Sequence, residues 1–217
     1  MIIVKDVKKF FDNGLTVALN GVSLQISKGE VVAISGPSGC GKSTLLNIIG
    51  TLEVPTSGEV FIEGENISKY YSQYNFRAKT IGFVFQFHYL IPTMTLIENV
   101  ELPMYSLSIP KNLRREKAKH ILDCMGLSDR ANFFPTKVSG GERQRAAIAR
   151  AIANDPKIIL ADEPTGNLDI DNGEMVMNYL LNLCKKESIT LLITTHNPSV
   201  ASMAGRIIYM KNGKVEK

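Results

Sequence analysis

The sequence predicts an α/β fold in which a mostly parallel sheet is covered by helices on both faces. Two observations indicate it. Segments typical of buried strands alternate with helical segments in the last third of the chain, and a β-branched run at residues 31–35 leads into a glycine-rich loop and a helical run. Strands that alternate with helices are the pattern of a parallel sheet. A proline-punctuated helical stretch in the middle of the chain indicates an insertion into this core.

The first third of the chain is typical of strands. Apolar and polar residues alternate over residues 22–27, which indicates a half-buried strand, and again at 60–62 after a turn signal at 55–58. The β-branched run at 31–35 suits a strand that is buried on both faces. Residues 45–49 predict the helix that follows the glycine-rich loop.

The middle of the chain is typical of helices. Between about residues 91 and 137, four prolines separate segments of helical period. Five residues could share one apolar helix stripe, namely Leu113, Ala118, Ile121, Leu122 and Met125. We therefore expect one domain over residues 1–217, with its core at about 1–86 and 157–217 and an inserted helical subdomain at about 87–156.

The last third returns to alternating strands and helices. Residues 172–186 predict a helix, and Asn212-Gly213 predicts a turn after the final strand. Four segments predict strands of the core. One lies just before the insertion, at residues 81–85, and three lie in the last third, at residues 157–162, 189–195 and 206–210.

Composition argues against several classes of protein. The 25 Lys and Arg residues against 21 Asp and Glu give a net charge of +4, so we expect no nucleic-acid partner, and the basic cluster at 111–119 is interpreted as a solvated helix face. No apolar run is long enough for a transmembrane helix, and residues 1–11 lack the apolar core of a signal peptide, so we expect a cytoplasmic location. Three widely spaced cysteines indicate neither a disulfide framework nor a structural zinc site.

A phosphate-binding loop is predicted after the strand at 31–35, where the pattern G-x-x-x-x-G-K-[ST] is matched in full. The candidate residues are Gly36, Pro37, Ser38, Gly39, Cys40, Gly41, Lys42, Ser43 and Thr44. Glycines let backbone N–H groups wrap around phosphate oxygens at the positive end of the next helix. Lys42 can reach the β- and γ-phosphates, the Ser43 hydroxyl can ligate Mg²⁺, and Cys40 is interpreted as a small filler residue.

Two acids end the predicted strand at 157–162. A buried strand that delivers carboxylates at its C-terminal end places them where open α/β sheets carry out their chemistry. Asp162 can hold the Mg²⁺ shell, through water, and Glu163 can polarise or orient the water that attacks the γ-phosphate. Adjacent strand residues point to opposite faces, so the two acids need not share a role.

Residues 138–144, Val-Ser-Gly-Gly-Glu-Arg-Gln, resemble the signature motif of ABC-type ATPases, usually L-S-G-G-Q. Further motifs stand in the order that this family requires: Gln86 resembles the Q-loop glutamine, Asp169 the D-loop aspartate, and His196 the switch histidine. Phe11 resembles the aromatic residue that stacks on adenine, with Phe10 as a rival for that role or both as core residues. Val138 and Glu142 depart from the commoner Leu and Gln of the signature, and we expect activity to survive both changes.

The resemblance implies a P-loop NTPase core with a mostly parallel sheet, an N-terminal antiparallel β subdomain and an inserted α-helical subdomain. It also implies that two copies form a head-to-tail homodimer on ATP binding. Each ATP, with Mg²⁺, would lie between the phosphate loop of one copy and the signature residues of the other, which are Ser139, Gly140, Gly141 and Glu142.

Roles for the remaining site residues follow from the same resemblance. The implied catalytic set is Glu163, His196 and Gln86, and the implied metal set is Ser43, Gln86 and Asp162. His196 would contact the γ-phosphate, Gln86 would reach the metal or the attacking water, and Asp169 would support the site across the dimer interface.

The single cassette fits best the ATP-binding subunit of a transporter that drives a separately encoded integral membrane permease, on the inner face of the cell membrane. The segments at 85–92 and 95–100 resemble the lipoprotein-releasing and macrolide-export subfamily. Phe87, Tyr89 and Leu90 would then form part of the groove for the permease, or else belong to the core. Two alternative functions remain: an ATPase that drives a cell-division or signalling membrane partner, and a nucleotide-binding scaffold that does not hydrolyse ATP.

Overall fold

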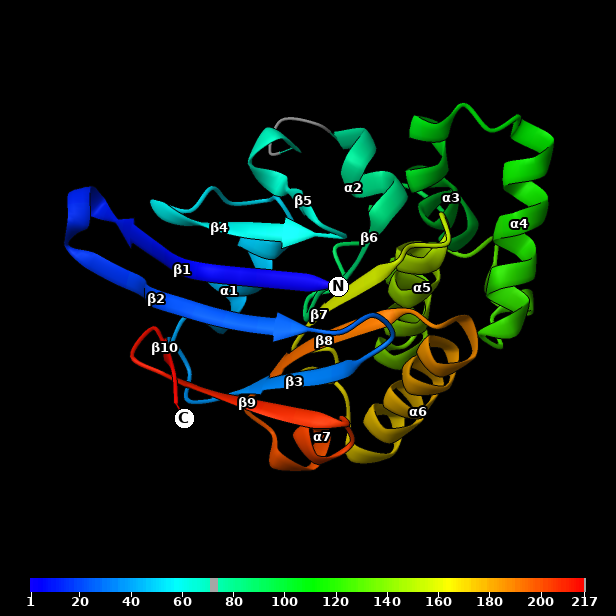
Figure 1. Ribbon diagram of the computed structural model, residues 1–217. Helices are drawn as coiled ribbons and strands as arrows, with labels where there is room; N and C mark the ends of the chain where they lie inside the picture. The colour runs from blue at the N-terminus through cyan, green and yellow to red at the C-terminus, as the bar shows by residue number, and fades with distance from the viewer. Residues whose placement is uncertain (71–73, 217) are drawn as a thin grey trace. The chain divides into compact units, whose positions relative to one another are not determined.

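Figure 1 shows the computed structural model of the chain, which describes residues 1–70 and 74–216. The chain divides into two compact units, of which the first comprises Met1–Tyr74 and Cys184–Lys217 and the second comprises Asn75–Leu183. The inserted subdomain that we expect at 87–156 falls within the second unit, and its boundaries stay a prediction. None of the described helices is long and apolar enough to cross a membrane.

An antiparallel sheet in the first unit has the strand order β2-β1-β4-β5. Its strands are β1 (Ile2–Phe11), β2 (Thr16–Ile26), β4 (Ser57–Ile62) and β5 (Glu65–Asn66). The predicted alternations fall in β2 and β4, but β1 is missing from the sequence-based prediction. Its register against β2 shifts between Val4 and Val7, where Asp6 takes a φ of 44°. This irregularity breaks the period of two that identifies a strand in a sequence.

A second group of strands in the first unit carries the phosphate loop. It contains β3 (Val31–Ser35), β8 (Thr190–Thr195), β9 (Arg206–Lys211) and β10 (Lys214–Val215). β3 pairs in parallel with both β8 and β9, so it lies between them, and Val32, Ala33 and Ile34 are fully buried as predicted. The helices of this unit are α1 (Lys42–Ile49) and α7 (Pro198–Ser202), with short 3₁₀ turns at Asp12–Gly14 and Ile67–Tyr70.

The second unit combines one parallel strand pair with most of the helices. β6 (Ile81–Val84) pairs in parallel with β7 (Ile158–Asp162), and both were predicted. Its helices are α2 (Tyr74–Thr80), α3 (Leu96–Glu101), α4 (Lys111–Cys124), α5 (Gly140–Ile152) and α6 (Ile170–Glu187), of which α2 and α6 extend past its boundaries. Three 3₁₀ turns connect them, at Leu102–Leu107, Ser128–Arg130 and Pro135–Lys137.

The predicted apolar stripe of α4 is correct except at its first member. Ala118, Ile121, Leu122 and Met125 are buried, whereas Leu113 is 50% exposed. At about 100° per residue, Leu113 lies about 140° around the helix from Ala118, so it faces away from the buried stripe. The basic cluster at 111–119 does lie on this helix, with Lys111 and Lys119 exposed to solvent.

Candidate nucleotide site

The phosphate loop connects β3 to α1. Three of its glycines have a backbone conformation that favours glycine, and at two of them the surrounding space also excludes a side chain. Gly36, Gly39 and Gly41 have φ values of 154°, 75° and 102°. A Cβ on Gly36 would lie 2.1 Å from the Met210 carbonyl oxygen, and one on Gly41 would lie 2.3 Å from the Ala18 carbonyl oxygen. These closest contacts are to backbone atoms, which cannot move aside as the end of a side chain would. Larger residues are therefore excluded at these two positions.

The lysine of this loop is held close to the backbone that a phosphate would approach. Lys42 is buried, and its ammonium group donates hydrogen bonds to the carbonyl oxygens of Gly36 (2.8 Å) and Pro37 (3.0 Å). Gly41 is the N-cap of α1 and makes no side-chain cap hydrogen bond. Cys40 is buried, in line with a filler role.

The two acids at the end of β7 lie at a sharp turn. Asp162 is the last residue of the strand, and Glu163 takes a φ of 45°, which is uncommon for a residue other than glycine. The fully buried Gln144 of α5 donates a hydrogen bond of 2.7 Å to the carbonyl oxygen of Pro164, directly after Glu163. This glutamine, which the sequence analysis did not assign to the site, therefore ties the signature helix to the acidic turn.

The signature motif forms the start of α5. Ser139 is the N-cap, and its hydroxyl accepts a hydrogen bond from the Glu142 N–H (3.2 Å), while the Glu142 carboxylate accepts one from the Ser139 N–H (2.7 Å). This capping box satisfies two backbone donors. Arg143 fixes the preceding turn by donating to the carbonyl oxygens of Val138 (2.7 Å) and Pro135 (3.4 Å). The hydrogen bond from Ser139 is the main cause that lowers the pKa of Glu142.

The Q-loop and the D-loop are in direct contact within the second unit. The side-chain amide of Asn167 donates a hydrogen bond of 2.8 Å to the backbone carbonyl of Gln86. A Cβ on Gly166 would lie 2.8 Å from the Gln86 amide nitrogen, so the glycine leaves space for that side chain. Asp169 accepts hydrogen bonds from the backbone and side chain of Asn172 at the start of α6, which lower the pKa of Asp169. Asn167 belongs to the segment 167–169 that resembles the D-loop, but its contact with Gln86 was not predicted.

The remaining nucleotide-site candidates lie in the first unit. His196 directly follows β8 and is exposed to solvent, and the next residue, Asn197, caps α7. Phe10 and Phe11 at the end of β1 are both half-buried, so neither is a fully buried core residue. The Lys9 ammonium lies 4.8 Å from the centre of the Phe11 ring. The choice between the two phenylalanines as the adenine-stacking residue stays open.

The aromatic segment after Gln86 is presented on the surface. Phe87 is 63% exposed and Tyr89 is 62% exposed, so the reading of these two residues as core is wrong. His88 and Tyr89 both have positive φ values, and Arg150 of α5 donates to both of their carbonyl oxygens, at 2.6 Å for His88. Arg150 therefore fixes an unusual backbone turn from a position 61 residues away, which no local pattern could indicate.

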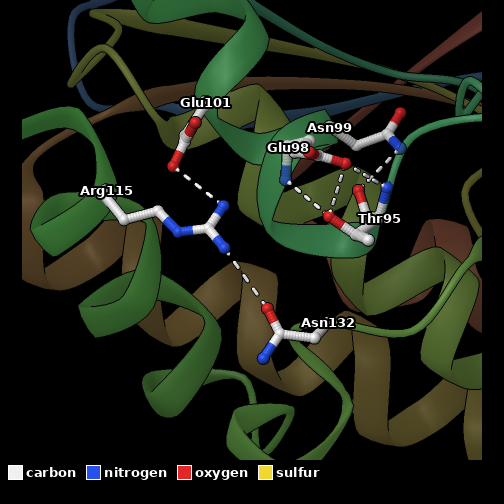
Figure 2. A network of polar contacts seen from close by, with 6 residues as sticks. All are labelled: Thr95, Glu98, Asn99, Glu101, Arg115 and Asn132. Atoms are coloured by element: carbon white, nitrogen blue, oxygen red, sulfur yellow. Dashed lines mark hydrogen bonds and ion pairs between the residues drawn. The ribbon is translucent and has the colours of Figure 1, made fainter. Parts of the chain in front are cut away.

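The segment that follows the aromatic residues is fixed by the polar contacts in Figure 2. The buried side chain of Asn99 donates to the carbonyl oxygens of Ile91, Met94 and Thr95 and accepts from the Ile91 N–H. Of these partners, Figure 2 draws Thr95. Thr95 and Glu98 form a capping box at the start of α3. From α4, Arg115 contacts Glu101 (3.2 Å) and Asn132 (3.3 Å), which connects α3 to α4. The contacts of Asn99 therefore fix residues 91–95, which follow the exposed aromatic segment in the chain.

Known proteins match this chain over most of its length. The family model described as "ABC transporter" matches residues 19–166. The chain is 48% identical to an uncharacterised ABC transporter ATP-binding protein of Methanocaldococcus jannaschii, over 99% of this chain and 97% of that protein. It is 44% identical to the lipoprotein-releasing system ATP-binding protein LolD of Bacteroides fragilis, over 99% of this chain and all of that protein.

Among solved structures, the chain resembles the ATP-binding cassette MJ0796 in a dimeric post-hydrolysis state bound to ADP and Pi. The TM-score is 0.91 at 44% identity, with coverage of 100% of this chain and 97% of that one. CbiO1 from Clostridium perfringens, part of the transporter complex CbiONQ, matches with a TM-score of 0.88 at 28% identity, over 100% of this chain and 86% of that one. These matches confirm the predicted α/β P-loop fold. The chain belongs to the ABC transporter family and is an ATP-binding ATPase of that family.

Proposed function

We propose that two copies of this chain close head to tail on two ATP molecules and that the resulting hydrolysis drives a separate membrane permease. The observation that carries the proposal is that one chain contains two different helix N-termini whose residues suit phosphate binding. The start of α1 follows a glycine loop with a lysine, and the start of α5 carries Ser139 and two glycines. Helix N-termini of this kind favour anions. A dimeric relative bound to ADP and Pi supports the sharing of each nucleotide between two copies.

Each residue has a defined task in this proposal. The loop from Gly36 to Thr44 binds the phosphates, and Lys42 leaves the carbonyl oxygens of Gly36 and Pro37 for the stronger acceptors that phosphate offers. Glu163 orients the water for in-line attack on the γ-phosphorus and accepts its proton, and His196 contacts the γ-phosphate. Binding and orientation of this kind supply most of the catalysis in phosphoryl transfer.

The proposed metal ligands suit Mg²⁺ by their chemistry. Ser43, Gln86 and Asp162 offer a hydroxyl, an amide carbonyl and a carboxylate, and such hard oxygen ligands are what Mg²⁺ prefers. When bound, Mg²⁺ would neutralise charge on the phosphate oxygens. The chain's own contribution is to hold these oxygen ligands at the end of β7, after β6 and at the start of α1.

The permease is the proposed partner of the aromatic segment. Phe87 and Tyr89 are exposed on a turn that Arg150 fixes, as expected for residues that receive a helix of a membrane subunit. Within the lipoprotein-releasing and macrolide-export subfamily, the relatives named lipoprotein-releasing system ATP-binding proteins support the lipoprotein-releasing type. Binding to the permease would keep the chain at the inner face of the membrane.

Glu163→Gln tests this function directly. The neutral amide keeps the shape of the side chain and removes the base, so ATP should bind and hydrolysis should stop. Light scattering should then show a stable dimer with ATP and a monomer without it. A Glu163→Gln protein that hydrolyses ATP at the parent rate as a monomer would contradict the role of Glu163 and the dimer together.

A further inference from the structure

The signature half-site contains a charge that the commoner family sequence lacks. Glu142 stands where the family usually has glutamine, three residues from Ser139, at the start of α5. A carboxylate at this position stabilises the helix start, but it also lies where nucleotide phosphate is proposed to bind. Like charges repel, so an uncompensated Glu142 would weaken the binding of a polyanion at Ser139.

The structure provides a compensating charge. The Arg130 guanidinium lies 3.2 Å from one Glu142 carboxylate oxygen, while the other oxygen accepts the hydrogen bond from the Ser139 N–H. Arg130 is also restrained by Phe133, whose ring centre lies 5.0 Å from the guanidinium carbon. Each carboxylate oxygen thus has its own partner, and the pair directs Glu142 into the capping box.

We propose that Arg130 is a positioning residue of the signature half-site, which neutralises Glu142 and holds it in the capping box so that the start of α5 accepts the nucleotide phosphate of the second copy. This inference rests on the proposed head-to-tail dimer. It explains how a glutamate can occupy this signature position: together, Arg130 and Glu142 have the net charge that a glutamine would have alone.

The proposal predicts an order of ATP affinities set by local charge. In the Glu163→Gln background, Glu142→Gln leaves the half-site one charge more positive, Arg130→Gln leaves it one charge more negative, and the double variant returns it to neutral. The ATP concentration that gives half-maximal dimer should fall two- to threefold with Glu142→Gln and rise about fivefold with Arg130→Gln. The double variant should lie within about twofold of the Glu163→Gln parent, and high salt should compress the series.

Two controls separate charge from structure. Lys117 of α4 forms an ion pair with Asp155, which follows α5. Lys117→Gln removes an equal charge from that pair and should leave the half-maximal ATP concentration unchanged. Arg130→Lys keeps the charge and should restore most of the affinity that Arg130→Gln loses. ATP binding to the monomer should not change in any of these variants, because it depends on the phosphate loop.

The outcomes discriminate between explanations. A double variant as weak as Arg130→Gln would show that Arg130 acts through folding or through another contact, and it would overturn the proposal. An Arg130→Gln variant that matches the parent would also overturn it. If the Glu163→Gln parent itself forms no dimer with ATP, that result contradicts the proposed function and therefore this inference as well.

Discussion

The two helix starts that are proposed to bind phosphate, those of α1 and α5, differ in the hydrogen bonds that they make within a single chain. At α1, the N-cap Gly41 makes no side-chain hydrogen bond, and the Lys42 ammonium donates to the backbone carbonyl oxygens of Gly36 and Pro37. At α5, the capping box between Ser139 and Glu142 already satisfies two backbone donors. In the proposed function, the first start therefore binds phosphate in a single chain. The second is already capped within its own chain, and in the proposed function it meets nucleotide phosphate only when two copies close.

The largest expected effect comes from substituting Lys42, the lysine at the start of α1. Lys42→Ala removes the buried ammonium that should move onto the β- and γ-phosphates, and a hydrogen bond to a charged group contributes about 1.5–3 kcal/mol. ATP binding to the monomer should weaken at least about tenfold, and hydrolysis should become undetectable. Equilibrium binding of a fluorescent ATP analogue would measure the first effect and phosphate release the second. Unchanged monomer affinity would show that Lys42 does not bind the phosphates.

The second helix start should respond differently. Ser139→Ala removes the N-cap hydroxyl, which should cost about 1 kcal/mol of stability and reduce turnover about tenfold. Monomer affinity for ATP should stay within about twofold of the parent, because the proposed dimer places Ser139 against nucleotide that is bound to the other copy. The same binding assay would measure it. A large loss of monomer affinity would place Ser139 in the same half-site as Lys42 and remove the contrast between the two starts.

The link between the signature helix and the acidic turn can be tested by Gln144→Leu. The variant leaves the buried carbonyl of Pro164 without its donor, which should cost about 1–3 kcal/mol of unfolding free energy in urea titrations. Turnover should fall as well, since Glu163 precedes this carbonyl. Gln25→Leu, at an exposed position of β2, is the matched control and should change neither quantity. Equal stability of the two variants would contradict the link.

The sequence identified those parts of the site that local patterns specify. The β-branched run of β3, the glycine loop and the acids that end β7 each depend on neighbouring residues, and the structure places them as predicted. The Ser-x-x-Glu spacing of Ser139 and Glu142 is itself a capping-box signal that could have been read in advance. In contrast, Gln144, Arg150 and Asn167 act on backbone carbonyls 20, 62 and 81 residues away, and nothing in their local sequence indicates those partners.

The smallest expected effect concerns pH. Burial, followed by the positive charges of Arg143 and Arg150, lowers the pKa of His88 below its usual 6.5. The His88 side chain therefore takes up a proton at a higher pH in the unfolded chain than in the folded chain. Its contribution to the free energy of unfolding should be fully present above pH 6.5 and should decline as the pH falls below that value. His88→Gln should flatten this decline between pH 7.5 and 5.5 in urea titrations. An identical pH dependence in the variant would show that His88 does not contribute.

The most direct test of the shared nucleotide sites is to mix two inactive variants. Lys42→Ala disables the phosphate loop. Gly140→Asp disables the signature, because the carboxylate repels phosphate while the nearest atom to a Cβ there is 3.8 Å away, so the chain can accommodate it. If each site is shared, a mixed dimer keeps one intact site, and an equal mixture should recover roughly a quarter of parent turnover by random pairing. Recovery of no activity, with both proteins folded and able to dimerise, would show that each site belongs to a single chain.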